Sequence, residues 1–214
     1  MPRPMLKRGA RGDAVRDLQE ALERHGFSPD GIDGIFGRKT EAAVRRFQTD
    51  RGLLVDGIVG PQTWGALCEP EFDPGAWNDG GPIQSNNNCY NYACDIQNGT
   101  FAQPGNAGGS PFSTTDCAAV GAGAVADGLA PIDCDEKECS ECCHIGALVI
   151  WPGTDFHWFR RDRDGNWTHK PGSTPARNTD NSGNIITDPR TADRGPYTVF
   201  CGCFCICAAK VSIG

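Results

Sequence analysis

The sequence has no long hydrophobic run and no excess of positive charge. None of its apolar stretches approaches the roughly 20 residues that a transmembrane helix needs, so we expect no membrane partner. The 214 residues carry a net charge of −7, whereas a nucleic-acid-binding protein presents a basic stripe, so nucleic acid is not expected as a partner either. Residues 1–13 are basic but lack the apolar segment of a secretory signal peptide. We therefore expect synthesis in a cytoplasm, with any extracellular work depending on another exit route.

Histidine is scarce, whereas cysteine is abundant. The chain has 4 histidines and 12 cysteines, and every cysteine except Cys68 lies in the last two thirds. An ordinary cytosolic protein does not carry so many cysteines. Disulfides formed after release, metal ligation and a buried reduced core all remain open.

Charge and composition divide the chain into two units. Residues 1–68 hold 11 Lys+Arg against 9 Asp+Glu, whereas the remainder is strongly acidic. Residues 69–82 are rich in proline and glycine and have no hydrophobic periodicity, which is typical of a linker. We therefore expect one domain over 1–68, a linker over 69–82 and a second domain over 83–214.

The first unit contains an internal repeat. Val15, Leu18 and Leu22 have the spacing of one helix face, and a glycine follows that helix. The segment D-G-I-F-G with a threonine three residues further on, over 33–40, is repeated as D-G-I-V-G with a threonine over 56–63. This pattern predicts two similar loop–helix units packed together.

These residues resemble the peptidoglycan-binding domain family. The resemblance runs over 6–68, from the opening motif to a final Thr-Trp pair, on these residues: Gly9, Gly12, Val15, Leu18, Gln19, Thr63 and Trp64. It implies a three-helix fold that binds glycan or stem peptide, with Asp33, Asp56 and Trp64 at the binding surface. The alternative is that these three residues serve only the loop geometry and the core.

The second unit contains a predicted hairpin with a histidine near the end of each strand. Within 146–169, an apolar run ends at Pro152-Gly153, a second strand begins at His157, and a polar turn leads to a return strand carrying His169. Facing residues of antiparallel strands lie about 5 Å apart, so the two imidazoles can share one site. They would suit a base and its orienting partner, and the alternative is two ordinary half-exposed histidines.

Two cysteines are candidates for a nucleophile. Cys89 follows three asparagines at 86–88, which favour a helix N-cap. A thiol at a helix N-terminus has a lowered pKa, which suits a nucleophile. Cys117 also follows good capping residues at 113–116, but a small, alanine-rich helix comes after it and indicates packing. We therefore favour Cys89 over Cys117.

The pattern C-x-x-Y-A at Cys89, followed far downstream by histidine, resembles the CHAP amidases and peptidases. The hairpin, with its histidines twelve residues apart, resembles the NlpC-type wall peptidases. Both are papain-like, which implies Cys89 as nucleophile, His157 as general base and His169 as its orienter. Cys89 lacks the D-C-S-G surroundings usual in these families, and the tail after residue 170 matches neither.

Four further residues are candidates around this site. We expect Trp158 and Trp167, beside the two histidines, to bind substrate. Asp180 and Asn181 lie in a long polar loop after the hairpin, and either is an alternative orienter of His157.

The remaining cysteines form two groups. Residues 134–144 read C-D-E-K-E-C-S-E-C-C-H; their irregular spacing favours disulfides within a loop over zinc. The other four cysteines alternate over 201–207, which predicts one face of a strand, packed as free thiols in a buried central strand.

The sequence therefore predicts an α+β protein with a small three-helix wall-binding domain and a papain-like domain with an antiparallel sheet and N-terminal helices. We expect a monomeric peptidoglycan hydrolase, a cysteine amidase or endopeptidase with no cofactor and no metal. Without a signal peptide it would act at the bacterial wall after release or injection, like an endolysin or a secreted effector. The alternatives are a toxin-like cysteine protease acting on protein and a non-catalytic wall-binding protein.

Overall fold

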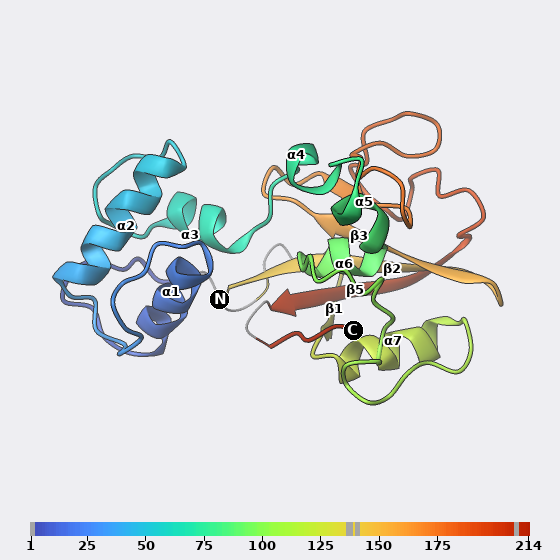
Figure 1. Cartoon of the computed structure of the whole chain (residues 1–214), viewed down its shortest axis with the longest axis horizontal. Helices are drawn as coiled ribbons and strands as arrows, with labels where there is room; N and C mark the ends of the chain where they lie inside the picture. Colours follow the sequence, from blue (N-terminus) through green and yellow to red (C-terminus); the bar gives the residue numbers. More distant parts are fainter. Residues whose placement is uncertain (1–2, 136–138, 140–141, 208–209) are drawn as a thin grey trace. The chain divides into compact units, whose positions relative to one another are not determined.

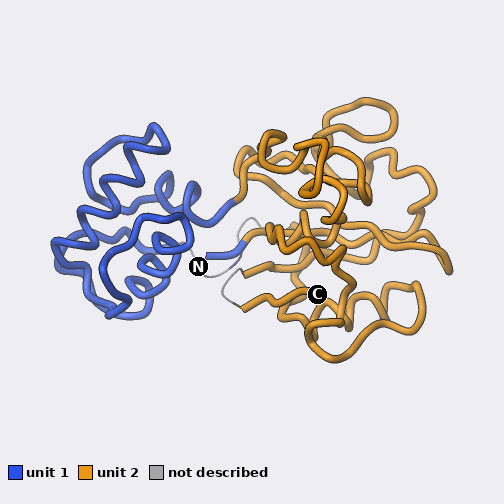
Figure 2. The backbone as a smooth tube through the Cα atoms, in the orientation of Figure 1, with its two compact units in different colours: residues 1–69, 138–143 blue, residues 70–137, 144–214 orange. Residues whose placement is uncertain are grey.

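The computed structural model describes residues 3–135, 139, 142–207 and 210–214. The chain divides into two units, one of residues 1–69 with 138–143 and the other of residues 70–137 with 144–214 (Figure 2). The first unit holds three helices, and the second holds short helices and a sheet (Figure 1). Among the described residues, no helix is long and apolar enough to cross a membrane.

The first unit consists of α1 (Asp13–Arg24), α2 (Arg38–Asp50) and α3 (Pro61–Cys68). Its core is formed by the apolar faces of these helices, as the spacing of Leu18 and Leu22 predicts, together with Phe47 and Trp64. The α1 helix ends just before Gly26, whose positive φ of 78° is a conformation that glycine adopts without strain. The predicted helical fold of this unit is confirmed.

The two repeated loops are held by two equivalent glutamines. The side-chain amide of Gln19 donates to Asp33 Oδ1 at 2.9 Å and to Thr40 Oγ1 at 3.2 Å, and its oxygen accepts the N–H of Gly34 at 2.8 Å. Gln48 repeats this arrangement one helix later, with the residues Asp56, Thr63 and Gly57. Both glutamines are 1 % exposed, so each loop is fixed to a helix by a buried network.

Among its described residues, the second unit contains four short helices and a five-stranded sheet. Its helices are α4 (Pro74–Trp77), α5 (Pro82–Asn86), α6 (Cys89–Cys94) and α7 (Cys117–Ala126). Its strands are β1 (Ala130–Ile132), β2 (Cys143–Trp151), β3 (Asp155–Arg161), β4 (Trp167–His169) and β5 (Val199–Cys207). The strand order is β1-β5-β2-β3-β4, and β3 pairs antiparallel with both β2 and β4.

The two faces of this sheet have different surroundings. On one face Leu148, Trp158 and Phe204 form a core with residues of α6 and α7. Because side chains alternate along a strand, His157 and its neighbours at i+2 and i+4 project from the opposite face. The paired histidines and a surface pocket described below therefore lie on the face away from α6.

The predicted linker is in fact part of the second unit. Trp77 is 3 % exposed and packs edge-on against Tyr92, with the ring centroids 4.9 Å apart. The side chain of Asn78 both donates to the carbonyl of Ala176 and accepts its N–H. Proline and glycine predicted a free connection here, but a single buried tryptophan fixes residues 70–82 to the domain.

Disulfides replace the predicted free thiols of β5. Cys117 is bonded to Cys201 and Cys134 to Cys203, while Cys205 and Cys207 are also in disulfides. The four cysteines do not share one face, because Cys201 packs against the core while Cys203 lines the pocket on the other face. Gly202, at φ 135°, lies between them and interrupts the alternation.

Two cysteines of 134–144 are bridged to residues outside this segment, contrary to the predicted disulfides within a loop. Cys142 is bonded to Cys68 of α3, Cys134 to β5, and Cys139 and Cys143 are also disulfide-bonded. Residues 136–138 and 140–141 of this segment lie outside the described part of the chain. Within the described part, no group of three or more His, Cys, Asp or Glu side chains is arranged to hold a metal ion.

Candidate functional site

Cys89 is the first residue of α6 and keeps a free thiol. Asn88 caps the helix by accepting the N–H groups of Tyr90 and Asn91, and the Asn91 side chain completes a capping box. Within the described residues the free cysteines are Cys89 and Cys94, both buried. Cys117, the rival nucleophile, has no thiol because its sulfur is bonded to Cys201.

The sulfur of Cys89 lies beside the free edge of β3. The ladder with β4 covers only 159–161 of β3, and the backbone N–H of Trp158 is directed at the Cys89 sulfur. The pKa of the thiol is raised to about 12: burial is the largest cause, the N–H of Trp158 opposes it, and the Asp155 carboxylate adds to the increase. The prediction of a lowered pKa is therefore wrong, because the helix N-terminus does not offset complete burial.

The two histidines meet as predicted. Nε2 of His157 lies 2.7 Å from Nδ1 of His169, and the His169 ring stacks on Phe159 at 4.9 Å. Nε2 of His169 lies 3.0 Å from both the carbonyl oxygen of Thr179 and Nε of Arg177. One ring nitrogen cannot donate to a carbonyl and accept from a guanidinium at once, so the two contacts correspond to different tautomers.

The choice of tautomer decides whether His157 can act as a base. If His169 donates to Thr179, its Nδ1 accepts the N–H of His157, and the other ring nitrogen of His157 carries a lone pair. The pKa of His157 is lowered well below its usual value and that of His169 to about 4, and burial is the largest cause in both. Arg177 contributes to both reductions, and the Thr179 carbonyl opposes that of His169. Both rings are therefore neutral at pH 7.

Around this pair the structure brings together an acid and a phenol. The Tyr197 hydroxyl donates to Asp155 Oδ2 at 2.7 Å, and the Tyr197 ring lies 5.3 Å from the His157 ring. Among the described residues, Cys89 makes no hydrogen bond to His157. The Cys89 sulfur instead lies at the edge of β3, the strand that carries His157. Hydrogen bonds between catalytic groups commonly tighten only in the substrate complex.

Lys170, directly after His169, connects β4 to the segment before Cys89. Its side chain is fully buried, and Nζ donates to the carbonyl oxygens of Gln84 and Asn87 at 2.5 Å and of Gly172 at 2.7 Å. Three donors thus meet three acceptors. The only signal for this role in the sequence was a lysine directly after a histidine in a predicted strand.

Several predicted site residues have other roles. Trp158 is 0 % exposed in the core and cannot bind substrate, and Trp64 is 3 % exposed and donates to the Pro4 carbonyl. Asp33 and Asp56 accept hydrogen bonds from Gln19 and Gln48, which is the loop role given above as the alternative. All four residues have structural roles, and Asp56 also lines a hollow on the first unit.

Neither alternative orienter contacts His157. The Asp180 carboxylate accepts the backbone N–H groups of Ser182, Asn184 and Asp193 and so organises its own loop. Asn181 accepts from Arg177 at 2.7 Å. The position beside His157 is taken by His169.

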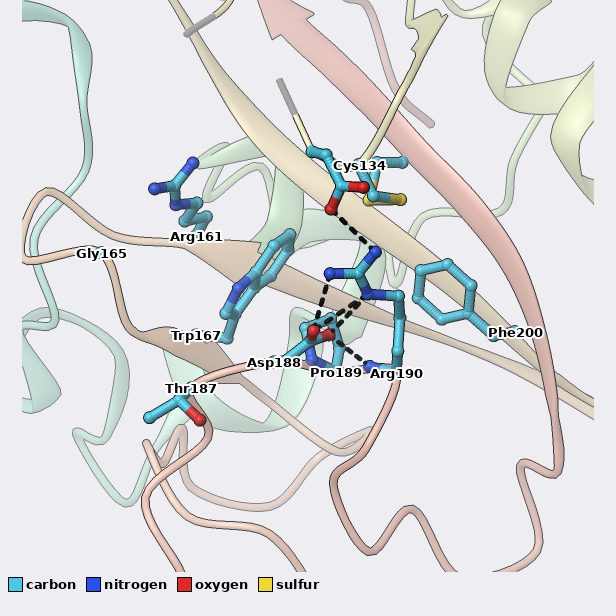
Figure 3. A pocket seen from close by; sticks show the side chains of 11 residues that line it. Cys134, Arg161, Gly165, Trp167, Thr187, Asp188, Pro189, Arg190 and Phe200 are labelled. Carbon is cyan, nitrogen blue, oxygen red and sulfur yellow. Dashed lines mark hydrogen bonds and ion pairs between the residues drawn. A yellow bond between two sulfur atoms is a disulfide. The ribbon is translucent and has the colours of Figure 1, made fainter. Parts of the chain in front are cut away.

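Trp167 lines a pocket of about 240 Å³ on the sheet face that carries His157. Figure 3 shows Arg190 between the Trp167 indole and the Phe200 ring, with its guanidinium hydrogen-bonded to Asp188. Arg190 also pairs with Asp135 at 2.9 Å. The pocket lining also includes Arg161, Gly165 and Thr187.

Comparisons with known proteins address both units. Residues 11–67 match the family described as putative peptidoglycan binding domain. Insoluble matrix shell protein 1 of Ruditapes philippinarum is 49 % identical to this chain over 136 residues, which are 64 % of this chain and 89 % of that protein. The chain belongs to the family of that protein. A match of this length extends well beyond 11–67, so the relationship includes the second unit.

Other relatives have the names of wall-degrading enzymes. A spore cortex-lytic enzyme of Bacillus cereus is 34 % identical over 105 residues, which are 44 % of this chain and 40 % of that enzyme. N-acetylmuramoyl-L-alanine amidase CwlL of Bacillus licheniformis is 49 % identical over 66 residues, 28 % of this chain and 17 % of the amidase. The chain thus spans less than half the length of either enzyme.

Proposed function

We propose that this protein is a peptidoglycan hydrolase that cleaves an amide bond of the peptide stem with Cys89, His157 and His169, at the bacterial wall after release or injection. The observation that carries the proposal is a free thiol beside the strand of a histidine pair, in a chain whose other cysteines, apart from Cys94, form disulfides. Ten cysteines are in disulfides, and Cys89 keeps a thiol at a capped helix start next to the strand of a paired histidine.

The first unit would bring the enzyme to its substrate. Its match to a peptidoglycan-binding family supports peptidoglycan as the partner. A hollow of about 240 Å³ on its second repeat includes the exposed side chains of Met5 and Leu54, which are 69 % and 74 % exposed, beside Gln62. Exposed apolar side chains around a hollow are typical of a binding surface, and we propose that the wall is bound here.

The order of proton transfers follows from the neutral states of the Cys89 thiol and the His157 imidazole. His157 removes the Cys89 proton as the sulfur attacks the amide carbonyl, because burial disfavours a preformed thiolate. The C–N bond then breaks, the proton passes from His157 to the leaving amine, and a thioester forms on Cys89. Water, deprotonated by His157, hydrolyses the thioester. His169, donating to Thr179, would hold His157 in the required tautomer.

The test is turnover of purified peptidoglycan by single variants. Cys89→Ser and His157→Ala are each expected to reduce turnover by at least 10³-fold, because nucleophile and base act as a unit. Cys94→Ala, the other free thiol, is the matched control and should retain turnover. Full activity of Cys89→Ser would exclude the thiol mechanism. If casein is cut and purified wall is not, the protein is instead a cysteine protease acting on protein.

A second candidate is a non-catalytic matrix or wall-binding protein. It is favoured by the name of the 49 % identical relative and by the absence, within the described residues, of a Cys89–His157 hydrogen bond. In that case native protein would bind insoluble peptidoglycan without releasing soluble fragments. Its Cys89 would also fail to react with a thiol reagent until the protein unfolds.

A further inference from the structure

We propose that the pocket around Trp167 binds an uncharged sugar ring and thereby holds the glycan next to the amide bond. This inference rests on the proposed function. It directs the reaction toward the bond that joins glycan to peptide, as an amidase would, and away from bonds within the peptide.

The position of the pocket relates it to the candidate catalytic pair. Arg161, in the pocket, lies four residues after His157 on the same strand and therefore on the same face. Four residues of a strand span about 13 Å. Trp167 is paired with Arg161 in register, and Phe159 and His169 form the pair between the pocket and His157. The pocket therefore lies along β3 from His157, on the same face of the sheet.

The charged side chains that line the pocket, two carboxylates and two guanidinium groups, offset one another. The guanidinium of Arg190 is bonded to Asp188 at 2.8 Å and to Asp135 at 2.9 Å, so two carboxylates surround one cation. Arg161 supplies the second positive charge of the lining. A pocket whose charges neutralise one another does not select a charged ligand, which disfavours the acidic peptide stem.

The remaining groups suit a sugar. Within the part of the chain that the structure describes, the Trp167 indole N–H and the Thr187 hydroxyl have no protein partner, although both belong to the pocket lining. The Trp167 and Phe200 rings lie on either side of Arg190 and add apolar lining, with Trp167 6 % exposed (Figure 3). Aromatic surface next to open neutral hydrogen-bonding groups matches the apolar faces and hydroxyl edges of a pyranose.

The test follows the NMR signals of the tryptophan indole N–H groups in the full-length Cys89→Ser protein. This measurement of binding needs no turnover. The chain has five tryptophans, so each indole gives its own NMR signal, and Trp167→Phe assigns the one of interest. Titration with chitotetraose, an uncharged N-acetylglucosamine tetramer, should shift the Trp167 signal saturably. The Trp64 signal reports on the first unit separately.

Two variants decide whether the sugar occupies this pocket. Thr187→Val removes one open hydroxyl without changing the side-chain shape and should raise the Kd for chitotetraose at least fivefold. Thr198→Val, an exposed threonine outside the pocket lining, is the control and should leave it unchanged. An unmoved Trp167 signal, or a shift retained in Thr187→Val, would overturn the proposal. So would a Trp167 shift caused by free stem peptide but not by the sugar.

Activity separates this inference from the proposed function. The wild-type protein should hydrolyse a muropeptide that carries its glycan with kcat/KM at least tenfold above that for the free stem peptide. Equal rates would refute the glycan subsite while leaving the thiol hydrolase intact. Absence of turnover on both substrates, with the Trp167 shift retained, would refute the hydrolase and leave the sugar site.

Discussion

Replacing Lys170 with methionine tests how the structure fixes the segment that carries Cys89. Methionine keeps most of the side-chain stem but removes the ammonium that bonds three carbonyl oxygens. A buried acceptor left without a donor costs about 1–3 kcal/mol. The carbonyls of Gln84 and Gly172 belong to partly exposed residues and can recruit water, whereas Asn87 is 2 % exposed. The expected loss of unfolding free energy is therefore about 1–3 kcal/mol, mainly from the Asn87 carbonyl.

Urea unfolding of the disulfide-intact protein measures this loss. With an m-value of about 2 kcal/mol/M, the midpoint should fall by about 0.5–1.5 M. Arg163→Met, in the same unit, removes a cation from an exposed pair with Glu71 and should cost less than about 1 kcal/mol. If Lys170→Met costs no more than Arg163→Met, the three contacts of Lys170 do not hold the Cys89 segment, and this reasoning is refuted.

Three further outcomes are expected. Burial lowers the pKa of both His144 and His169 from 6.5 to about 4, so the folded state binds fewer protons than the unfolded state between these two pH values. The free energy of unfolding should therefore be full above pH 6.5 and fall by about 2–3 kcal/mol per histidine on approaching pH 4. A urea midpoint that stays constant from pH 7 to 4 would contradict this. Gln48→Ala and Gln19→Ala should destabilise the first unit by similar amounts, about 2–4 kcal/mol, because each breaks an equivalent buried network. Unequal decreases in Tm for the two variants would argue against the equivalence of the two loops. Replacing both Cys117 and Cys201 with serine should lower the free energy of unfolding by about 2–4 kcal/mol and leave turnover per folded molecule unchanged. A loss of turnover without a loss of stability would reopen the nucleophile assignment.

The elements that follow from periodicity were predictable from the sequence. The spacing of Leu18 and Leu22 defined α1, and the polar turn after β3 predicted the hairpin that joins His157 to His169. These predictions succeeded because the signal is local: side-chain alternation and turn residues are encoded within a few positions.

The failures concern long-range contacts. Nothing near Trp77 indicated that it would pack on Tyr92, and cysteine spacing could not identify the pairing of Cys117 with Cys201. The prediction for the Cys89 pKa considered the helix start alone, whereas the β-sheet that buries the thiol is brought there by the tertiary fold. Burial also removed Trp158 from the substrate-binding candidates, although its neighbour His157 remains.

Intact-protein mass spectrometry of an acid-quenched reaction with soluble peptidoglycan fragments tests the central claim most directly. A thioester intermediate adds the mass of the acyl part of the substrate to one cysteine. The proposed mechanism predicts this adduct on the peptide containing Cys89, at a level reduced at least tenfold by His157→Ala and unaffected by Cys94→Ala. Hydrolysis of the fragments without any adduct in rapid-quench samples, or an adduct on Cys94, would contradict the assignment of Cys89 as the nucleophile.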